Sequence, residues 1–366
     1  MNTILENILS MTWQQGVMVA IGALLVFLAI KFEMEPTLLL PMGFGCIMVN
    51  LPGAHVAALE TLFNAGIETE LFPLILFIGI GAMIDFTPLL TNPKLMIFGA
   101  AAQFGIFFTL CAATLLGFDI KDAASIGIIG AADGPTSIVV ANAFKSNYMS
   151  AIMVAAYSYM ALVPIIQPPV IKMVTTKKER LIRMDYTARK VPKIVLILFP
   201  VLITVVAGFV APSSIELVGF LMFGNLIRVC GVLDSLSETA QKVLANLVTI
   251  FLGITVATSM VGEKFLRVET LVILGLGLVA FVFDTIGGVM VAKIYNIFAK
   301  KKINPMIGAA GISAFPMSAR VINKMGLEED NQNFLLMHAV GVNVSGQIAS
   351  VIAGGMILTL FAGFAG

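Results

Sequence analysis

Asp133 is an acidic residue surrounded by helix-breaking residues inside an otherwise uncharged stretch of the chain. Gly130, Gly134 and Pro135 flank it, and residues 123–144 contain no other Asp, Glu, Lys or Arg. Glycine loosens a helix and proline removes a backbone donor, so carbonyl groups are freed close to the carboxylate. A carboxylate with carbonyls and hydroxyls forms an oxygen shell that suits a small hard cation, Na⁺ or H⁺.

A second predicted helix break lies in the other half of the chain. Two prolines, Pro305 and Pro316, enclose two glycines and stand among the polar residues Asn304 and Ser313. These two side chains could offer neutral oxygens to a cation without adding charge. Discontinuous segments at matching places in two halves are the best sequence indication of a transport site in a membrane.

Each of these residues also has a purely structural interpretation. Asp133 could cap the helix that begins at Gly134 and Pro135, and the neutral polar residues could hydrogen-bond helices to one another. Asp133 ranks first among the candidates because a bare carboxylate at membrane depth is poorly solvated and either cation neutralises it. Competition of Na⁺ and H⁺ for one carboxylate would couple their movements.

The segments that carry these residues have the composition of a polytopic membrane protein. Of the 366 residues 59% are apolar and 12% are charged, whereas a typical soluble chain has about 25% charged residues. A span needs about 20 apolar residues, so the length provides for on the order of ten helical spans. Charge-free windows that can each cross a bilayer as a helix are 7–30, 36–59, 95–118, 146–171, 194–215, 243–262 and 334–366. A net charge of +1 offers no basic surface for nucleic acid.

A basic linker divides the chain almost in half. Residues 172–193 contain eight Lys or Arg against two acids, so the positive-inside rule predicts that the linker is cytoplasmic. It separates a first transmembrane repeat, 1–171, from a second, 194–366. Two pairs of short segments agree in order and spacing between these halves: FIGIGA from Phe77 with FLGITVA from Phe251, and IGAADGP from Ile129 with IGAAGIS from Ile307. Such echoes favour an internal duplication.

Three long motifs resemble the membrane β subunits of the biotin-dependent, Na⁺-translocating decarboxylases, the family of the oxaloacetate, methylmalonyl-CoA, glutaconyl-CoA and malonate enzymes. They are GAADGPTSIVVANAF from Gly130, YSYMALVPIIQPPVIK from Tyr157 and NPMIGAAGISAFPMSARV from Asn304. The resemblance implies an all-α fold of two inverted repeats with broken or re-entrant segments, working as an elevator-type transporter in the cell inner membrane. It implies that carboxybiotin is decarboxylated at this subunit with consumption of a proton while Na⁺ leaves the cytoplasm.

The resemblance also implies a set of site residues and partners. The site residues are Asp133, Tyr159, Asn304, Gly308, Ser313, Arg320 and Asn343. Na⁺ would bind at Asp133, Asn304, Gly308, Ser313 and Asn343. The planar fork of Arg320 would hold the carboxyl group of carboxybiotin or pair with Asp133 in one state, and Tyr159 could orient or pass a proton. The implied partners are a biotin carrier subunit, which bears the biotin, a carboxyltransferase subunit, a small membrane anchor subunit and further copies of this chain.

Composition and repeats fit a second class of protein equally well. A Na⁺-coupled carboxylate symporter or a Na⁺/H⁺ antiporter could use the same two breaks, and only the resemblance separates these alternatives. The chain has no G-x-x-x-x-G-K-[ST] motif, which excludes ATP as a driving force within this subunit. Asp284, in the apolar run FVFDTIGG, is a further candidate for a second cation site or a pairing residue. Arg228 is either its partner or a residue near a membrane surface.

Overall fold

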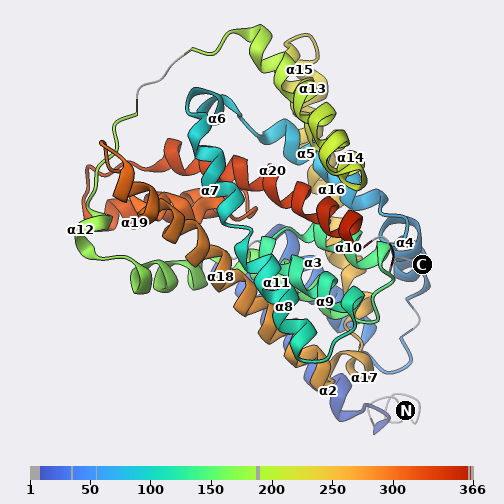
Figure 1. The fold of residues 1–366 in the computed structure, drawn as a ribbon. Coiled ribbons are helices and arrows are strands. Elements are labelled where there is room, and N and C mark those ends of the chain that lie inside the picture. Colours follow the sequence, from blue (N-terminus) through green and yellow to red (C-terminus); the bar gives the residue numbers. More distant parts are fainter. Residues whose placement is uncertain (1–8, 34–35, 55, 187–189, 362, 364–366) are drawn as a thin grey trace.

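The fold is entirely helical in the residues that the structure describes. The computed structural model describes residues 9–33, 36–54, 56–186, 190–361 and 363. Eight helical segments there are long and apolar enough to cross a membrane. They are α2 (Trp13–Lys31), η1 to α8 (Pro93–Leu115), α11 (Met149–Val174), α13 (Lys193–Val210), η3 and α14 (Pro212–Cys230), α15 to η5 (Asp234–Ser259), α18 (Val268–Phe298) and α20 (Leu336–Leu360) (Figure 1). The prediction of an all-α polytopic membrane protein is therefore confirmed.

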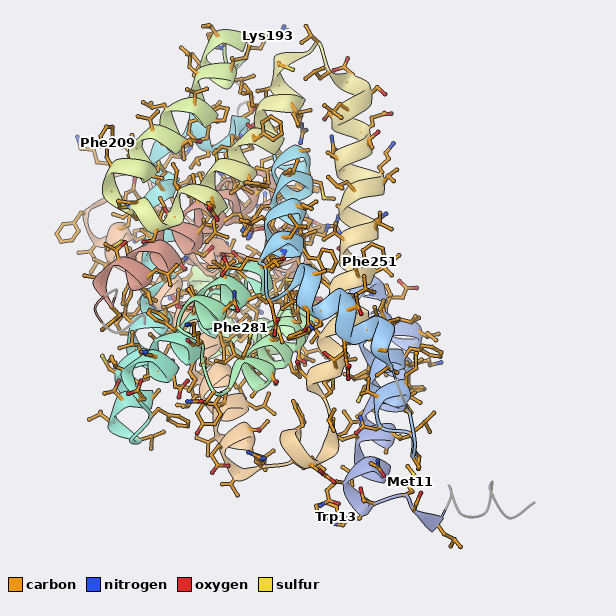
Figure 2. All side chains as sticks on the ribbon, turned by 90° about the vertical axis from the view of Figure 1, so that its right-hand side faces the viewer. Met11, Trp13, Lys193, Phe209, Phe251 and Phe281 are labelled. Atoms are coloured by element: carbon orange, nitrogen blue, oxygen red, sulfur yellow. The ribbon has the colours of Figure 1, made fainter. Side chains whose placement is uncertain are left out.

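The outer surface of these helices is apolar, as contact with lipid requires. Phe209 on α13 is 85% exposed, whereas Phe281 on α18 is fully enclosed. Figure 2 shows both residues, with the α13 side chains fanning outward from the molecule. An exposed apolar surface of this extent would be a liability in water and is normal for a protein that faces lipid.

Two stretches differ from straight spans. The helices α4 (Ala57–Gly66) and α5 (Leu71–Met83) form a pair bent by 67°. The helix α3 (Pro36–Val49) has 14 residues, about 21 Å at 1.5 Å per residue, which is shorter than a hydrocarbon core of about 30 Å. The prediction of one span across the 36–59 window is thus wrong. The helix ends before Leu51-Pro52-Gly53, where Gly53 has a φ of +70°.

Both predicted helix breaks are present. In the first half, α9 (Ile120–Gly127) tightens into the 3₁₀ turn η2 (Ile128–Ala131), and α10 (Gly134–Ala143) begins after Asp133. Between them Ala132 has a left-handed φ of +52°, which interrupts the helical path. In the second half, the 3₁₀ segment η6 (Pro305–Gly311) is followed by an irregular stretch and then by α19 (Met317–Glu329).

Helices of the two halves pack against each other in a reciprocal manner. α5 of the first half contacts α14 of the second so closely that a Cβ atom on Gly81 would collide with the carbonyl group of Leu221. In the converse pair, α3 of the first half contacts α16 (Ala245–Val256) of the second, and a Cβ atom on Gly45 would lie 2.9 Å from the carbonyl oxygen of Ile254. The two halves are therefore interleaved.

Candidate cation site at the helix breaks

Asp133 is held at the first break by neutral donors. Its side chain is 4% exposed. Oδ2 accepts hydrogen bonds from the Thr136 hydroxyl at 2.7 Å, from Gln347 Nε2 at 3.2 Å and from the Ser350 hydroxyl at 3.3 Å. Oδ1 accepts a long bond of 3.5 Å from the Thr136 amide, as expected for the cap of α10. The capping interpretation therefore holds. All of these donors are neutral, and within the described ranges no cationic side chain pairs with the carboxylate.

The carboxylate lines a cavity where the two breaks meet. The cavity has a volume of about 220 Å³. Its polar lining residues come from both halves of the chain: Thr37, Asp133, Tyr157, Asn246, Thr249, Ser313 and Gln347. The amide of Ser313 donates to the carbonyl of Ala131 at 3.0 Å, which joins the second break directly to the first. The structure thus brings the predicted residues Asp133 and Ser313 together.

Side-chain amides hold the carbonyl groups of the second break. Gln167 Nε2 donates to Ala309 at 2.7 Å, Gln103 Nε2 to Gly311 at 3.3 Å and Asn343 Nδ2 to Ile312 at 2.7 Å. Irregular backbone at membrane depth is tolerated only when such groups are satisfied or line a cavity. These three amides therefore explain how the break is stable inside the protein.

Asn343 has an additional feature that matters for a cation. Its Oδ1 atom is buried and has no hydrogen-bond partner among the described residues. A buried amide oxygen is normally paired. Asn343 lies outside the lining of the Asp133 cavity, but its amide group is hydrogen-bonded through Nδ2 to Ile312, next to Ser313. The predicted ligand Asn343 is thus present with an oxygen that a Na⁺ ion could take.

Sequence reasoning missed the rest of the polar surface on α20. Asn343, Gln347 and Ser350 are spaced at i, i+4 and i+7, so they share one face of the helix. This spacing could have predicted the polar surface, because a polar stripe on an otherwise apolar transmembrane helix must face protein or water. Asn246 and Thr249, at i and i+3 on α16, form a second such pair in the cavity lining.

Tyr159 does not line the cavity. Its hydroxyl group donates to the carbonyl of Leu274, and its ring packs on Gly277 of α18. Tyr157 lines the cavity instead, and its buried hydroxyl has no partner among the described residues. Two residues along a helix differ by about 200° in direction, so the sequence motif could not distinguish the two tyrosines.

Asn304 and Gly308 also lie outside the cavity lining. Asn304 Oδ1 caps η6 by accepting from the Met306 amide at 3.1 Å, and Nδ2 donates to the linker carbonyls of Arg180 at 2.8 Å and Ile182 at 3.0 Å. Gly308 allows a close approach, because a Cβ atom there would collide with the backbone of Gly288 on α18. In this structure both residues position the second break and neither contacts Asp133.

Arg320 lies on the exposed side of α19 and lines a separate, open hollow of about 430 Å³. Glu33, Thr37 and Lys324 also line this hollow. Thr37 lines the cavity of Asp133 as well, so the two hollows adjoin at that residue. The part of the chain that the structure describes contains no ion pair between Arg320 and Asp133.

The composition of the site argues for a monovalent cation. No group of three or more His, Cys, Asp or Glu residues that could hold a metal ion is present within the described ranges. One carboxylate with hydroxyl and amide oxygens is a hard donor set of low charge, which does not suit Zn²⁺ or other borderline-soft metals. The donor set fits Na⁺ or H⁺ as a transported substrate.

Fold and site together define a polytopic membrane protein with an oxygen-lined cavity at two paired helix breaks. The family model of the Na⁺-transporting oxaloacetate decarboxylase beta subunit matches residues 14–361. The chain therefore belongs to this family of membrane subunits of sodium-pumping decarboxylases, and the prediction from the three motifs is confirmed.

Curated relatives agree over nearly the full length. The methylmalonyl-CoA decarboxylase subunit beta of Veillonella parvula is 47% identical, with 97% of this chain and 95% of the relative covered. The glutaconyl-CoA decarboxylase subunit beta of Acidaminococcus fermentans is 46% identical over 98% and 96% of the two chains. The oxaloacetate decarboxylase beta chain of Klebsiella pneumoniae is 44% identical over 94% of each. These matches favour a decarboxylase subunit over a symporter or antiporter.

Proposed function

We propose that this chain decarboxylates carboxybiotin delivered by a biotin carrier subunit and couples the reaction to Na⁺ export, with Asp133 binding Na⁺ and H⁺ in turn. The observation that carries the proposal is the position of Asp133: a buried carboxylate with neutral donors only, in a cavity where two helix breaks join. Either cation would neutralise the charge, and occupancy by one excludes the other.

The proposed Na⁺ ligands are oxygens of Asp133 and Ser313, which line the cavity, and of Asn343, which is hydrogen-bonded to the second break at Ile312. Asp133 supplies the charge, while Ser313 and Asn343 supply a hydroxyl and an amide oxygen from the second half. Asn304 and Gly308 contribute by shaping the second break, which their contacts to the linker and to α18 support. Ligands from two separately held segments would let the site change its affinity when one segment moves against the other.

In the proposed reaction, carboxybiotin enters the hollow of Arg320 and the guanidinium group holds its carboxylate. The bond between the carboxyl carbon and the ureido nitrogen breaks, CO₂ leaves, and the electron pair stays on the nitrogen, which takes up one proton. The adjoining position of the two hollows at Thr37 supports delivery of that proton from the Asp133 cavity. Tyr157, whose hydroxyl is buried in the lining, is better placed to pass a proton than Tyr159.

We further propose two inverted repeats, 1–171 and 194–366, that work as an elevator-type transporter. The reciprocal pairs α5 with α14 and α3 with α16 support this arrangement, since a twofold relation between the halves would produce both. A break follows the fourth apolar helical region in each half. Motion of the breaks past the remaining helices would carry the Asp133 cavity toward one side of the membrane and then the other.

The linker 172–193 is proposed to lie in the cytoplasm of a cell with this chain in its inner membrane. Its basic composition supports that side. α12 (Lys177–Arg180) lies beside α19 (Figure 1), and Arg180 pairs with Glu329 at 2.5 Å. The linker is thus attached to α19, the helix that carries Arg320. A cytoplasmic linker would place the Arg320 hollow on the same side of the membrane as a cytoplasmic biotin carrier. A carboxyltransferase subunit, a small membrane anchor subunit and further copies of this chain complete the proposed complex.

The test uses proteoliposomes that hold this chain with its partner subunits. Free carboxybiotin is added, and ²²Na⁺ movement and CO₂ release are followed together. The proposal predicts that Na⁺ moves only while CO₂ appears. Uptake of Na⁺ driven by a carboxylate gradient without CO₂ release would contradict the proposal and select the symporter.

A further inference from the structure

A second buried acid, Asp284, lies in the middle of the long helix α18. Its side chain has no solvent exposure. Oδ1 accepts a hydrogen bond of 2.5 Å from the amide of Gly105 on α8 (Phe104–Leu115). The backbone of Gly105 can donate because the preceding turn of the η1 to α8 segment is irregular at Ala102-Gln103. Asp284 thus has one satisfied oxygen at membrane depth.

The other oxygen of Asp284 is enclosed without a partner. Oδ2 is buried and has no hydrogen bond to the described part of the chain. A Cβ atom on Gly130 would lie 2.6 Å from Oδ2, and one on Gly105 would lie 2.6 Å from Oδ1. Two glycines therefore form a notch that closes around the carboxyl group. A metal cation needs several oxygen ligands, which a notch of glycine backbone and one carboxyl group does not provide.

Among the described residues, no cationic side chain forms an ion pair with Asp284. Arg228, its candidate partner from the sequence, donates instead to the carbonyls of Met83 at 2.5 Å and Ala82 at 3.4 Å, so that pairing prediction is wrong. Of the segments packed against α18, α7 (Met96–Ala101), η2 and η6 contain no titratable residue, and α8 contains only the exposed Cys111.

Two other neighbours of α18, α9 and α11, carry titratable groups that form no hydrogen bond with Asp284 in the described part of the chain. Asp122 accepts from the Ser146 hydroxyl at 2.6 Å, Tyr159 donates to Leu274, and Tyr157 lines the Asp133 cavity. The lysines of these helices lie near their ends, at Lys121 and Lys172. Any compensation of Asp284 must therefore come from a proton.

We propose that Asp284 carries a proton in this conformation and releases it when the first helix break moves away from α18. In the neutral form, Oδ1 accepts from Gly105 and Oδ2 bears the hydrogen, so no charge is buried. An unpaired carboxylate at this depth would be strongly disfavoured. On release, the O–H bond breaks, the electron pair stays on Oδ2, and the proton passes to water.

The position of the notch links this proton to the cation at Asp133. Gly130, which covers Oδ2, belongs to η2, and Asp133 is three residues further along the same break. A displacement that carries Asp133 toward water also uncovers Asp284. This role in the transport cycle rests on the proposed function, in which the breaks move, whereas the protonated state of Asp284 in the present conformation does not.

The first experiment tests the protonated state by infrared difference spectroscopy on the purified chain in membranes at neutral pH. The variant Asp284→Asn should lose a carbonyl-stretch band of a protonated carboxyl group, because the amide keeps the shape of the neutral acid without the band. The matched control Asp122→Asn changes another buried acid, one that accepts bonds from Ser146 and Asn147, and should keep the band.

If Asp284→Asn does not fold, Asp284→Glu serves in its place and should shift the band. A protonated-carboxyl band identical in the wild type and in every Asp284 variant would overturn the proposal.

The second experiment tests release during turnover in the complete complex. Asp284→Asn should lower coupled turnover by about 100-fold, the lower end of what a positioned proton-transfer group contributes. Na⁺ binding should be nearly unchanged. The Na⁺ concentration that gives half of the protection against thermal unfolding should stay within about twofold of the wild-type value, a difference in binding free energy below about 0.5 kcal/mol. Wild-type turnover of this variant would overturn the role. A wild-type complex that fails to couple CO₂ release to Na⁺ movement would instead refute the proposed function and leave the infrared result intact.

Discussion

The two helix breaks share a place in the chain order of their halves but differ in how they are held. The first contains the single carboxylate Asp133, whose donors are neutral and whose cavity is open to other polar groups. The second contains no charged residue between Asn304 and Ser318, and its carbonyls are tied by Gln103, Gln167 and Asn343. This difference indicates that the two breaks have different roles. In the proposed mechanism the carboxylate of the first break exchanges cations, and the second break is held in a fixed position by side-chain amides.

The largest effect should come from removing the charge of the first break. Asp133→Asn keeps a side-chain oxygen for the cap of α10 but cannot alternate between a charged and a neutral form. We expect coupled Na⁺ movement and decarboxylation to fall together by at least about 100-fold, measured as ²²Na⁺ transport and CO₂ release in the reconstituted complex. Asp122→Asn is the matched control and should retain both. Preserved turnover of Asp133→Asn would remove this residue from the mechanism.

A pair of variants separates the two functions of the second break. Asn343→Ala removes the side-chain donor to the carbonyl of Ile312, and Gln167→Ala removes one of two donors to the carbonyl of Ala309, the other being the Ser318 hydroxyl. Each variant should lower the free energy of unfolding by about 1–2 kcal/mol. Of these two residues, Asn343 alone has a side-chain oxygen without a hydrogen bond among the described residues. Only its variant should therefore weaken Na⁺ binding, by about tenfold or 1.4 kcal/mol. Thermal unfolding titrated with Na⁺ measures both quantities. Equal Na⁺ affinities for the two variants would assign Asn343 to positioning alone.

Substitution of Arg320 should weaken the binding of carboxybiotin rather than the binding of Na⁺. Arg320→Lys keeps the charge but loses the planar fork that matches a carboxylate. We expect the half-saturating concentration of carboxybiotin to rise by about tenfold, the loss of roughly one charge-assisted hydrogen bond, with Na⁺ affinity unchanged. An equal loss in both affinities would indicate that Arg320 pairs with Asp133 during the cycle.

The smallest effect concerns the linker that holds the second break. A hydrogen bond from Arg183 to Asp330, 2.6 Å long, lowers the pKa of Asp330 below its ordinary value. A carboxyl group with a lowered pKa in the folded state stabilises it at neutral pH, and this contribution is lost as the pH falls through that pKa. The midpoint of thermal unfolding of Arg183→Gln should therefore lie slightly below that of the wild type at pH 7 and converge with it in strong acid. A difference that does not change with pH would contradict this assignment.

The sequence contains enough information to predict where the two helix breaks lie. It does not predict which groups form hydrogen bonds with the residues of the breaks. Glycines and prolines around Asp133 and Asn304 predict both interruptions, because backbone chemistry is local. The partners of Asn304 are carbonyl groups of the linker, and every residue type has a carbonyl, so no sequence signal could identify them. The same limit applies to Asp284, whose neighbours are the backbones of Gly105 and Gly130.

The rotation of a helix about its own axis is a second property that the sequence alone does not predict. The motif that contains Tyr157 and Tyr159 predicts a tyrosine at the site but not which one, since the choice depends on the rotation of α11 about its axis. In contrast, the polar stripe of α20 could have been found from the spacing of Gln347 and Ser350 after Asn343. The short helix α3 differs from its window because Pro52 and Gly53 end the helical path inside an uncharged run, which charge counting alone does not detect.

The central claim, that Na⁺ and H⁺ occupy one carboxylate in turn, is tested most directly by counting protons during Na⁺ binding. The purified chain in weakly buffered detergent solution is titrated with Na⁺ while the pH is recorded, beside the Asp133→Asn variant. The account predicts that the wild type releases protons as Na⁺ binds and that the variant neither binds Na⁺ at the same concentrations nor releases protons. Na⁺ binding of equal strength in both proteins, or binding without proton release by the wild type, would contradict it.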